Sequence, residues 1–189
     1  MRIKYISCFI LLAAIAVTGC GSEPIKMADT GKMPSNTGVL VVGLHTNYDS
    51  LDKPVFAQGL RFRFAEKGKE ELGYIKLNFE GKDNIQVINL PANRYHFFQL
   101  ESSSLMLRVH DSSKFDIKPD TINYIGDIYV TIDMENSMAR IAVKDSFDEI
   151  TQYMKKTYPK MSESYKIKKE LVDINPKSIS ETLTERYYK

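Results

Sequence analysis

Short segments in which every second side chain is apolar recur along the chain, and they limit the fold more than any other feature. The longest spans Thr121–Asp133, TINYIGDIYVTID. A period of two places one face of a strand against a core and the other toward solvent. We therefore predict a long strand here, and Gly126 within it indicates a bulge or a bend. The alternation assigns these side chains to one face: Ile122, Tyr124, Ile128, Val130 and Ile132.

Eight further segments alternate in the same way or form short apolar runs between turn residues, and we expect each to be a strand. They cover residues 38–44, 60–64, 72–79, 85–90, 94–100, 105–110, 115–117 and 138–143. No helical pattern of useful length interrupts the series. The sequence therefore predicts a mainly β protein folded as an antiparallel β-sandwich, and it excludes a doubly wound parallel sheet.

One short helix is expected after the last strand. Ser146 and Glu149 have the spacing of a capping box, in which two side chains satisfy free backbone N–H groups at a helix start. Pro159 ends the pattern. The apolar side chains between them fall on one narrow face, which we expect to pack on the sandwich: Phe147, Ile150, Met154 and Tyr158.

The N-terminus has the features of an export signal. Arg2 and Lys4 precede an uncharged stretch over residues 5–17. A membrane-spanning helix needs about 20 apolar residues, whereas this run of about 13 has the length of the apolar part of a secretory signal. A buried core helix is the alternative, but the run is apolar on every side. We predict a signal peptide over residues 1–19.

The signal ends in Val17, Thr18, Gly19 and Cys20, which resemble the bacterial lipobox. The resemblance implies that signal peptidase recognises the first three residues and that the Cys20 thiol carries lipid, palmitate included. A free or disulfide-bonded cysteine is the alternative, but the other cysteine of the chain, Cys8, lies within the leader. Two or three acyl chains anchor a protein durably to a bilayer.

The residue after the lipidated cysteine indicates the destination. By resemblance to Gram-negative lipoproteins, an aspartate at this position would imply retention in the inner membrane. The chain has Gly21 there instead. We therefore expect a lipoprotein of the bacterial cell envelope, anchored in the outer membrane and facing the periplasm.

The charge of the mature chain bears on its partners. The chain holds 26 basic and 24 acidic side chains, and the leader removes two of the basic ones. The remaining charges balance, which argues against a dedicated nucleic-acid-binding protein with a basic face.

Four segments follow from these patterns. Residues 1–19 form the signal peptide, and residues 20–37, polar and without a period, form a flexible tether behind the lipid. Residues 38–161 form the sandwich with its helix, and residues 162–189 form a charged tail. Within the tail, Ser178 and Glu181 offer a second capping box for a short C-terminal helix, which would be marginal in isolation.

Three motifs resemble a group of bacterial lipoproteins that contain a domain of unknown function. They are LPANRY at 90–95, FDIKPDTINYIGDI at 115–128 and VKDSFDEITQYMKKTYP at 143–159. The resemblance covers about residues 38–161 and implies a transthyretin-like or carboxypeptidase-regulatory-like sandwich. Asn93 and Asp120 replace two glycines of the family pattern, and both tolerate the left-handed backbone region. The family has no assigned chemistry, so it implies no catalytic residue.

The sequence contains no recognised catalytic or phosphate-binding motif, and we predict no catalytic, cofactor or metal residue. Two weaker alternatives stay open. His96 and His110 would meet if a one-residue bulge shifted their strands, and four aspartates could form a carboxylate cluster. Asp127 is the most interesting of the four and is expected to cap a bulge beside Gly126. The four are Asp127, Asp133, Asp145 and Asp148.

The leading hypothesis is a non-enzymatic envelope lipoprotein that binds a partner protein. Tyr153, Tyr158 and the pair Tyr187 and Tyr188 are candidates for the contact, because tyrosine is enriched at interfaces. A module for a small ligand or a glycan is the first alternative. An uncharacterised hydrolase with a carboxylate site is the second.

Overall fold

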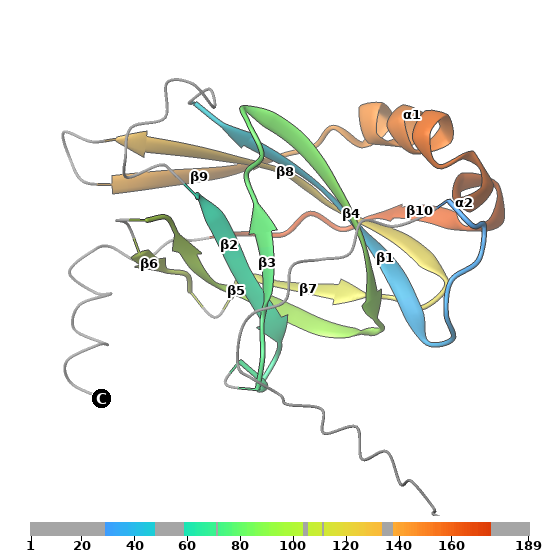
Figure 1. Ribbon diagram of the computed structural model, residues 1–189, viewed down its shortest axis with the longest axis horizontal. Helices are drawn as coiled ribbons and strands as arrows, with labels where there is room; N and C mark the ends of the chain where they lie inside the picture. The colour runs from blue at the N-terminus through green and yellow to red at the C-terminus, as the bar shows by residue number, and fades with distance from the viewer. Residues whose placement is uncertain are drawn as a thin grey trace, which may run out of the picture.

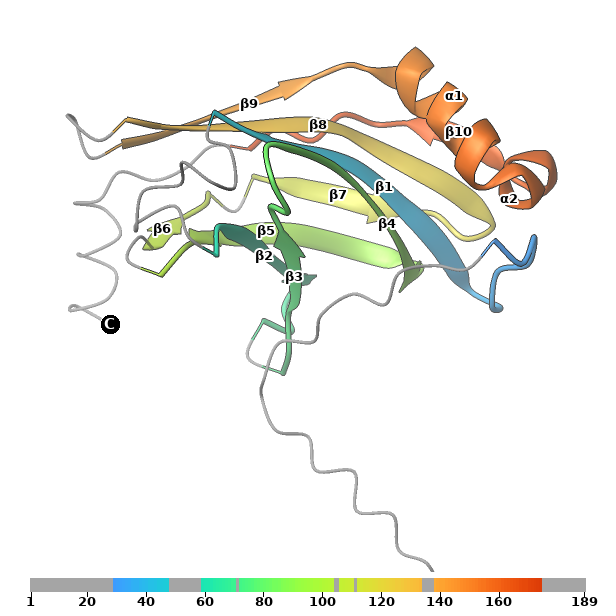
Figure 2. The ribbon, with the colours of Figure 1, turned by 45° about the horizontal axis from the view of Figure 1, so that its top comes forward.

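The computed structural model describes residues 29–47, 59–70, 72–103, 106–110, 112–133 and 138–174. The predicted signal peptide, Cys20 and the predicted C-terminal helix lie outside these residues. Within the described residues the chain forms two packed β-sheets, with two short helices on the outer face of one of them (Figures 1 and 2). The predicted mainly β sandwich is therefore confirmed.

The sheet that carries the helices, called here the helix-covered sheet, has the order β10-β8-β1-β4, and β9 also pairs with β8. Its strands are β1 (Thr37–Thr46), β4 (Asp83–Pro91), β8 (Thr121–Asp133), β9 (Met138–Lys144) and β10 (Lys166–Lys169). The second sheet has the order β3-β2-β5-β6, with β7 beside β5. Its strands are β2 (Arg61–Glu66), β3 (Ile75–Asn78), β5 (Asn93–Glu101), β6 (Met106–Arg108) and β7 (Lys114–Ile117).

Two strand pairs depart from the antiparallel expectation. β1 and β10 both run parallel to β8, whereas the other pairs are antiparallel. Turn signals fix the direction of strands that follow one another closely, as in the β2–β3 hairpin where Phe62 lies opposite Leu77. No turn joins β1 to β8, so no local signal in the sequence specifies how they pair.

The main core lies between the two sheets. Alternate residues of β1 point into it, and an aromatic group from β2, β5 and β7 faces them from the second sheet. Its rings lie 5.1–5.8 Å apart between centroids. The aromatic group consists of Phe64, Tyr95, Phe97 and Phe115.

A bulge in β8 changes the face to which its side chains point. Gly126 has φ +110°, and the pairing of β1 with β8 shifts register at this place. Ile122 and Tyr124 therefore point outward, under the helices, whereas Ile128 and the apolar residues after it point into the main core. The predicted irregularity at Gly126 is confirmed, but the assignment of all five side chains to one face is wrong.

Two helices follow β9 rather than one. Helix α1 (Phe147–Thr157) buries Ile150 and Met154, and Pro159 starts the short helix α2 (Pro159–Ser164) after ending α1. The predicted capping box does not form, because the Ser146 side chain makes no cap hydrogen bond. The Asp145 carboxylate instead accepts a hydrogen bond from the Phe147 N–H at 3.1 Å.

The chain after α2 belongs to the sandwich, so the predicted boundary at residue 161 is too early. β10 pairs with β8, and Val172 and Ile174 are buried in the main core. Three lysines in β10 gave this segment the composition of a solvated tail. The backbone pairing of β10 with β8 and the burial of the two later apolar residues nevertheless make the segment part of the sandwich.

The C-terminal part of the predicted tether is hydrogen-bonded to the folded domain. Both carboxylate oxygens of Asp29 accept hydrogen bonds from α2, at 3.3 Å from the Lys160 N–H and 3.1 Å from the Met161 N–H. The Met33 N–H donates to the Tyr165 hydroxyl at 2.9 Å. The described chain therefore reaches the domain at Asp29 and not at residue 38.

Candidate functional site

A histidine lies between two carboxylates on the outer face of the helix-covered sheet, beyond the N-terminal end of α1. His45 is the last residue but one of β1 and lies directly opposite Asp83 of β4, while Gly43 lies opposite Asp127 of β8. Three strands that are distant in sequence therefore bring these groups together. We call His45, Asp83, Asp127, Tyr124 and Tyr129 the His45 cluster.

Each ring nitrogen of His45 faces a carboxylate. Nδ1 lies 2.7 Å from Asp83 Oδ1, and Nε2 lies 3.3 Å from Asp127 Oδ2. The Asp127 residue is 6% exposed, whereas the Asp83 side chain is 62% exposed. A protonated imidazole can donate to both carboxylates at once, whereas a neutral ring can donate to only one of them.

Tyr124 ties the cluster to the start of α1. Its buried hydroxyl donates to Asp127 Oδ1 at 3.0 Å and accepts a hydrogen bond from the Ser146 N–H at 2.9 Å. Burial raises the pKa of the Tyr124 phenol far above its usual value, and the nearby Asp127 carboxylate adds to the effect. The phenol therefore stays protonated near neutral pH and acts as a hydrogen-bond donor.

Gly43 leaves the room that the Asp127 carboxylate occupies. A Cβ at this position would overlap Asp127 Oδ1 and would lie 2.5 Å from its Cγ. A glycine at the centre of an otherwise apolar strand costs stability. Here it permits a buried carboxylate to lie against the backbone of β1.

The ring of Tyr129 forms one wall of the cluster. It stacks on the His45 imidazole, with 4.2 Å between centroids and 10° between planes. The Lys144 ammonium group lies 4.2 Å from the Tyr129 ring centroid. Burial is the main cause that raises the pKa of the Tyr129 phenol.

The polar groups of the His45 cluster bind to one another and do not form a reactive centre. The two carboxylates lie at opposite nitrogens of one ring, so the three groups do not converge on a point where a metal could sit. Among the residues that the structure describes, no group of three His, Cys, Asp or Glu side chains has a metal-binding arrangement. The cluster can cross-link β1, β4 and β8 and hold the start of α1.

A second polar site lies on the outer face of the second sheet. A pocket of about 380 Å³ is lined by Lys67, Gly68, Glu70, His96 and Lys114. Glu70 accepts a hydrogen bond from the Gly68 N–H at 2.9 Å, and its carboxylate lies 3.1 Å from His96 Nε2. Hydrogen bonds from the backbone N–H groups of Glu70 and Gly68 lower the pKa of the Glu70 carboxyl.

At the other end of β5, a buried carboxylate joins two arginines. Glu101 is 3% exposed and pairs with Arg61 at 2.5 Å and with Arg63 at 2.6 Å, and it also accepts a hydrogen bond from Gln99. Burial raises the pKa of the Glu101 carboxyl, but the hydrogen bonds from the two arginines outweigh it and the net pKa is lowered. Arg63 also lies over the ring of Tyr74, at 4.4 Å from its centroid.

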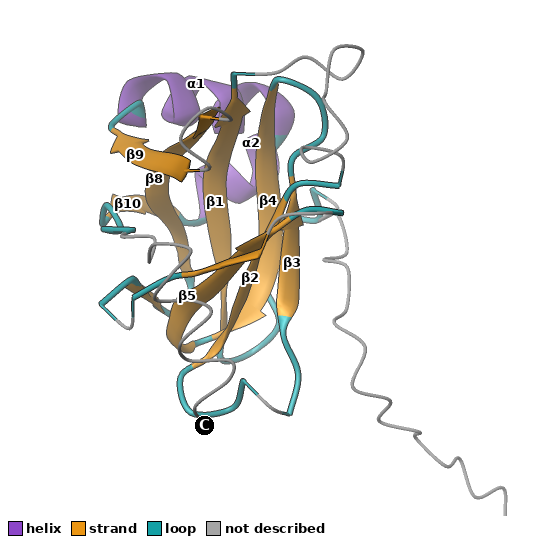
Figure 3. Ribbon diagram, turned by 90° about the vertical axis from the view of Figure 1, so that its left-hand side faces the viewer, coloured by secondary structure: helices purple, strands orange, loops and turns teal. Residues whose placement is uncertain are grey.

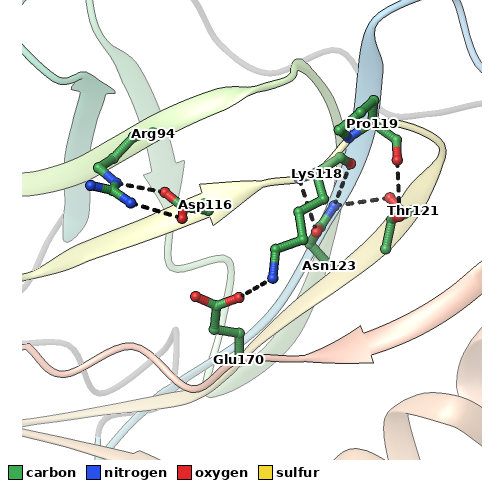
Figure 4. A network of polar contacts seen from close by, with 7 residues as sticks. All are labelled: Arg94, Asp116, Lys118, Pro119, Thr121, Asn123 and Glu170. Atoms are coloured by element: carbon green, nitrogen blue, oxygen red, sulfur yellow. Dashed lines mark hydrogen bonds and ion pairs between the residues drawn. The ribbon is translucent and has the colours of Figure 1, made fainter.

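The left-handed turn before β8 is held by a buried amide (Figure 4). Asp120 has φ +50°, in the left-handed region that aspartate tolerates, whereas Asn93 begins β5 without a positive φ. Asn123 accepts a hydrogen bond from the Lys118 N–H and donates to the carbonyl oxygens of Thr121, Lys118 and Val39. Lys118 pairs with Glu170 of the segment after β10 at 2.7 Å.

The structure separates the candidates for a metal site or a carboxylate cluster. His96 lies opposite Lys114 of β7, and His110 is exposed beyond the end of β6. Asp145 pairs with Lys169 at 2.6 Å. Asp148 is exposed on α1, and the Asp133 side chain lies outside the described part. Asp127 lies at the bulge, as predicted, but its neighbours are His45 and Tyr124.

Sequence reasoning missed the association of His45 with Asp83. The two residues are 38 positions apart, and only the register of β1 against β4 shows that they are opposite. Tyr153 and Tyr158 contact each other on the helix side, with 6.4 Å between centroids. Residues 17–20 and Tyr187 and Tyr188 lie outside the described residues.

Comparison with known proteins assigns no family. No protein-family model and no curated protein matches the chain. Among the described residues, no helix has the length and apolar character needed to cross a membrane.

Proposed function

We propose that the protein is a lipid-anchored lipoprotein of a bacterial envelope, and that its β-sandwich is a non-enzymatic module that binds a partner. The leader and the lipobox at 17–20 support the anchor. The observation that carries the proposal is this run of a basic start, an uncharged stretch and Val17–Cys20; the attachment of Asp29 to α2 adds where an anchor at Cys20 would hold the domain.

The anchor would be short. Nine positions separate Cys20 from Asp29, and a fully extended chain of that length spans at most about 30 Å. The domain would therefore remain close to the lipid, with α2 nearest to the point of attachment. The second sheet lies on the opposite side of the sandwich from the helices (Figure 2), where a partner could reach it.

Substitution of Cys20 by Ala tests the anchor. We expect the variant to lose metabolic palmitate labelling and to leave the membrane fraction. Cys8→Ala is the matched control, because it removes the other cysteine from the predicted leader and should leave both labelling and fractionation unchanged. Palmitate incorporation that persists in Cys20→Ala would refute the proposal.

The His45 cluster favours a binding module over a hydrolase. Its two carboxylates are both engaged with one imidazole, and its phenols have raised pKa values that keep them protonated. The described residues Asp145 and Asp127 do not converge on a common point. A partner protein would be identified by crosslinking in intact cells followed by mass spectrometry, which suits a tethered domain.

A module for a small acidic ligand is the second candidate, and the pocket on the second sheet favours it. Lys67 and Lys114 line this pocket, and neither makes an ion pair with another described residue. Ammonium groups at the mouth of a pocket attract carboxylates and phosphates. Glucuronate, an acidic sugar, is a suitable probe, with glucose as its neutral counterpart.

An NMR titration separates the two candidates. Saturable shifts of the Gly68 and His96 amides with glucuronate but not with glucose would support the pocket. The shifts should be lost in Lys67→Ala combined with Lys114→Ala, and they should persist in Lys82→Ala, a control at an exposed lysine outside the pocket. Equal shifts with both sugars would exclude recognition of the acid.

A further inference from the structure

β4 forms an edge of the helix-covered sheet, and among the strands that the structure describes it pairs with β1 alone (Figure 3). The hydrogen bonds at its two ends show which of its backbone groups face that neighbour. The Thr46 N–H donates to Lys82 O, and the Ala92 N–H donates to Asn36 O. Because antiparallel pairs alternate, the even-numbered residues of β4 bond to β1 and the odd-numbered residues direct their N–H and C=O groups away from it.

The outward backbone groups of Ile85, Val87 and Asn89 make no backbone hydrogen bond with any other described residue. The side-chain Oδ1 of Asn89 is also buried without a hydrogen-bond partner in this part of the chain. Pro91 agrees with this assignment, because a proline in a sheet is tolerated where its missing N–H would face outward.

The other edges of the two sheets are protected in ways that β4 is not. β10 carries three lysines, and β9 carries Arg140 and Lys144. The edge strands of the second sheet have only three or four residues. Short strands and edge lysines are the devices that prevent pairing with other chains. β4 has nine residues and carries no charge from Asn84 to Leu90.

We propose that two copies of this chain pair through β4, antiparallel, with Val87 opposite Val87 of the second copy. In this register Ile85 of each copy lies opposite Asn89 of the other. The groups that point outward then form about six backbone hydrogen bonds across the interface. A second copy is the occupant because the strand is uncharged and complementary to itself, as a two-fold interface requires.

The symmetry of this dimer would place both predicted anchors on the same side, so that both could enter one membrane. The two-fold axis of an antiparallel pair within a continuous sheet runs perpendicular to that sheet. The outer faces of both helix-covered sheets, with α2 and Asp29, therefore look in the same direction. Two anchors can then enter one bilayer, a point that rests on the proposed function, whereas the pairing itself does not.

The expected affinity is low in dilute solution. One strand edge buries less than the roughly 1,200–2,000 Å² typical of stable interfaces. Confinement to one membrane raises the effective concentration of the second copy and compensates for the small area. The dimer should therefore form on membranes and in concentrated protein.

Cysteine crosslinking tests the pairing. In a hydrogen-bonded antiparallel pair the Cα atoms lie about 5.5 Å apart, which a disulfide can bridge. Full-length Val87→Cys should give a disulfide-linked dimer after mild oxidation, both in membranes and as purified protein at high concentration. Lys82→Cys, just before the start of β4, is the control and should give no disulfide-linked dimer, because residue 82 does not lie opposite its own copy in this register.

A proline variant makes the result specific. Asn89→Pro removes an outward N–H and leaves the hydrogen bonds to β1 intact, so the fold should persist by circular dichroism. Added to Val87→Cys, it should reduce the dimer at least tenfold.

Three results would overturn the pairing: no dimer of Val87→Cys in either preparation, equal crosslinking of Lys82→Cys, or an unchanged dimer with Asn89→Pro. Fractionation of the same cells reports on the anchor separately. Dimer in concentrated protein together with a soluble Cys20-containing chain would refute the anchor and leave the pairing in place.

Discussion

Gly43→Ala tests whether a glycine in β1 was selected to make room for a buried carboxylate. Gly43 has an ordinary extended backbone, so alanine is conformationally allowed there and would by itself stabilise the strand by about 0.5–1 kcal/mol. The new methyl group would overlap the Asp127 carboxylate. Asp127 must then move away from His45 Nε2 and from the Tyr124 hydroxyl.

The cost follows from what this displacement exposes. A buried donor that loses its acceptor costs about 1–3 kcal/mol, but the Tyr124 hydroxyl retains a weaker acceptor in Lys144 O at 3.4 Å. We expect a net loss of about 1–2 kcal/mol. For a domain of this size each kcal/mol lowers Tm by roughly 2–4 °C, so Tm should fall by about 2–8 °C.

The assay is thermal unfolding at pH 7 of four proteins: the wild type, Gly43→Ala, Asp127→Ala and the double variant. In the Asp127→Ala background the overlap with the carboxylate disappears. The remaining close contact, 3.0 Å to His45 Nε2, is with a side chain that has lost its Asp127 partner and can shift, so Gly43→Ala should become neutral or stabilising. This change of sign is the decisive observation. An equal fall in Tm in both backgrounds would place the cost elsewhere and refute the reasoning.

Three further substitutions test other parts of the structure. Ile128→Asp places a charge in the main core, where Ile128 is fully buried, and should abolish cooperative unfolding; an unaltered melting curve would contradict the inward face of β8. Glu101→Gln tests the lowered pKa of Glu101: the wild-type carboxylate stabilises the fold above the pKa of the unfolded chain and loses this effect as the pH falls through the folded pKa. The variant should therefore lose less Tm between pH 7 and pH 3, and an identical pH profile would exclude that role. Asp29→Ala should accelerate amide hydrogen exchange at Lys160 and Met161 without changing exchange in β1, and unaltered rates at both amides would show that Asp29 does not hold α2.

The sequence predicts the strands well because each is half-buried and bounded by turn residues. The predicted strand at 85–90, for example, lies within β4, and the predicted strand at 72–79 contains β3. Side-chain direction within β8 was predicted less well. A bulge inserts one residue without altering the apolar pattern after it, so alternation continues through Gly126 while the face changes.

The sequence predicts only part of the candidate site. Asp127 could be singled out because it follows the bulge glycine. Its partners His45 and Asp83 come from β1 and β4, and the pairing of β1 with β8 is parallel and not joined by a turn. Contacts that depend on the register of distant strands leave no local pattern in the sequence. For the same reason the sequence predicts a charged tail where β10 pairs with β8.

The docking of Asp29 changes how the predicted tether would work. The segment before β1 is held by the two hydrogen bonds from α2 to Asp29, by the one from the Met33 N–H to the Tyr165 hydroxyl and by the one from the Ala92 N–H to Asn36 O. Each contributes about 0.5–1.5 kcal/mol, and together they are fewer than the hydrogen bonds that pair β1 on both of its sides. Force on the anchor would therefore release the segment before β1 while the sheet stays intact, because regions with few buried contacts open first. Release would lengthen the tether from nine positions to 17, counted from Cys20 to Thr37. Its maximum reach would then grow from about 30 Å to about 60 Å. If Cys20 carries the proposed anchor, the docked segment would be the short form of the tether and the released segment its long form, and the contacts with α2 would set the balance between them.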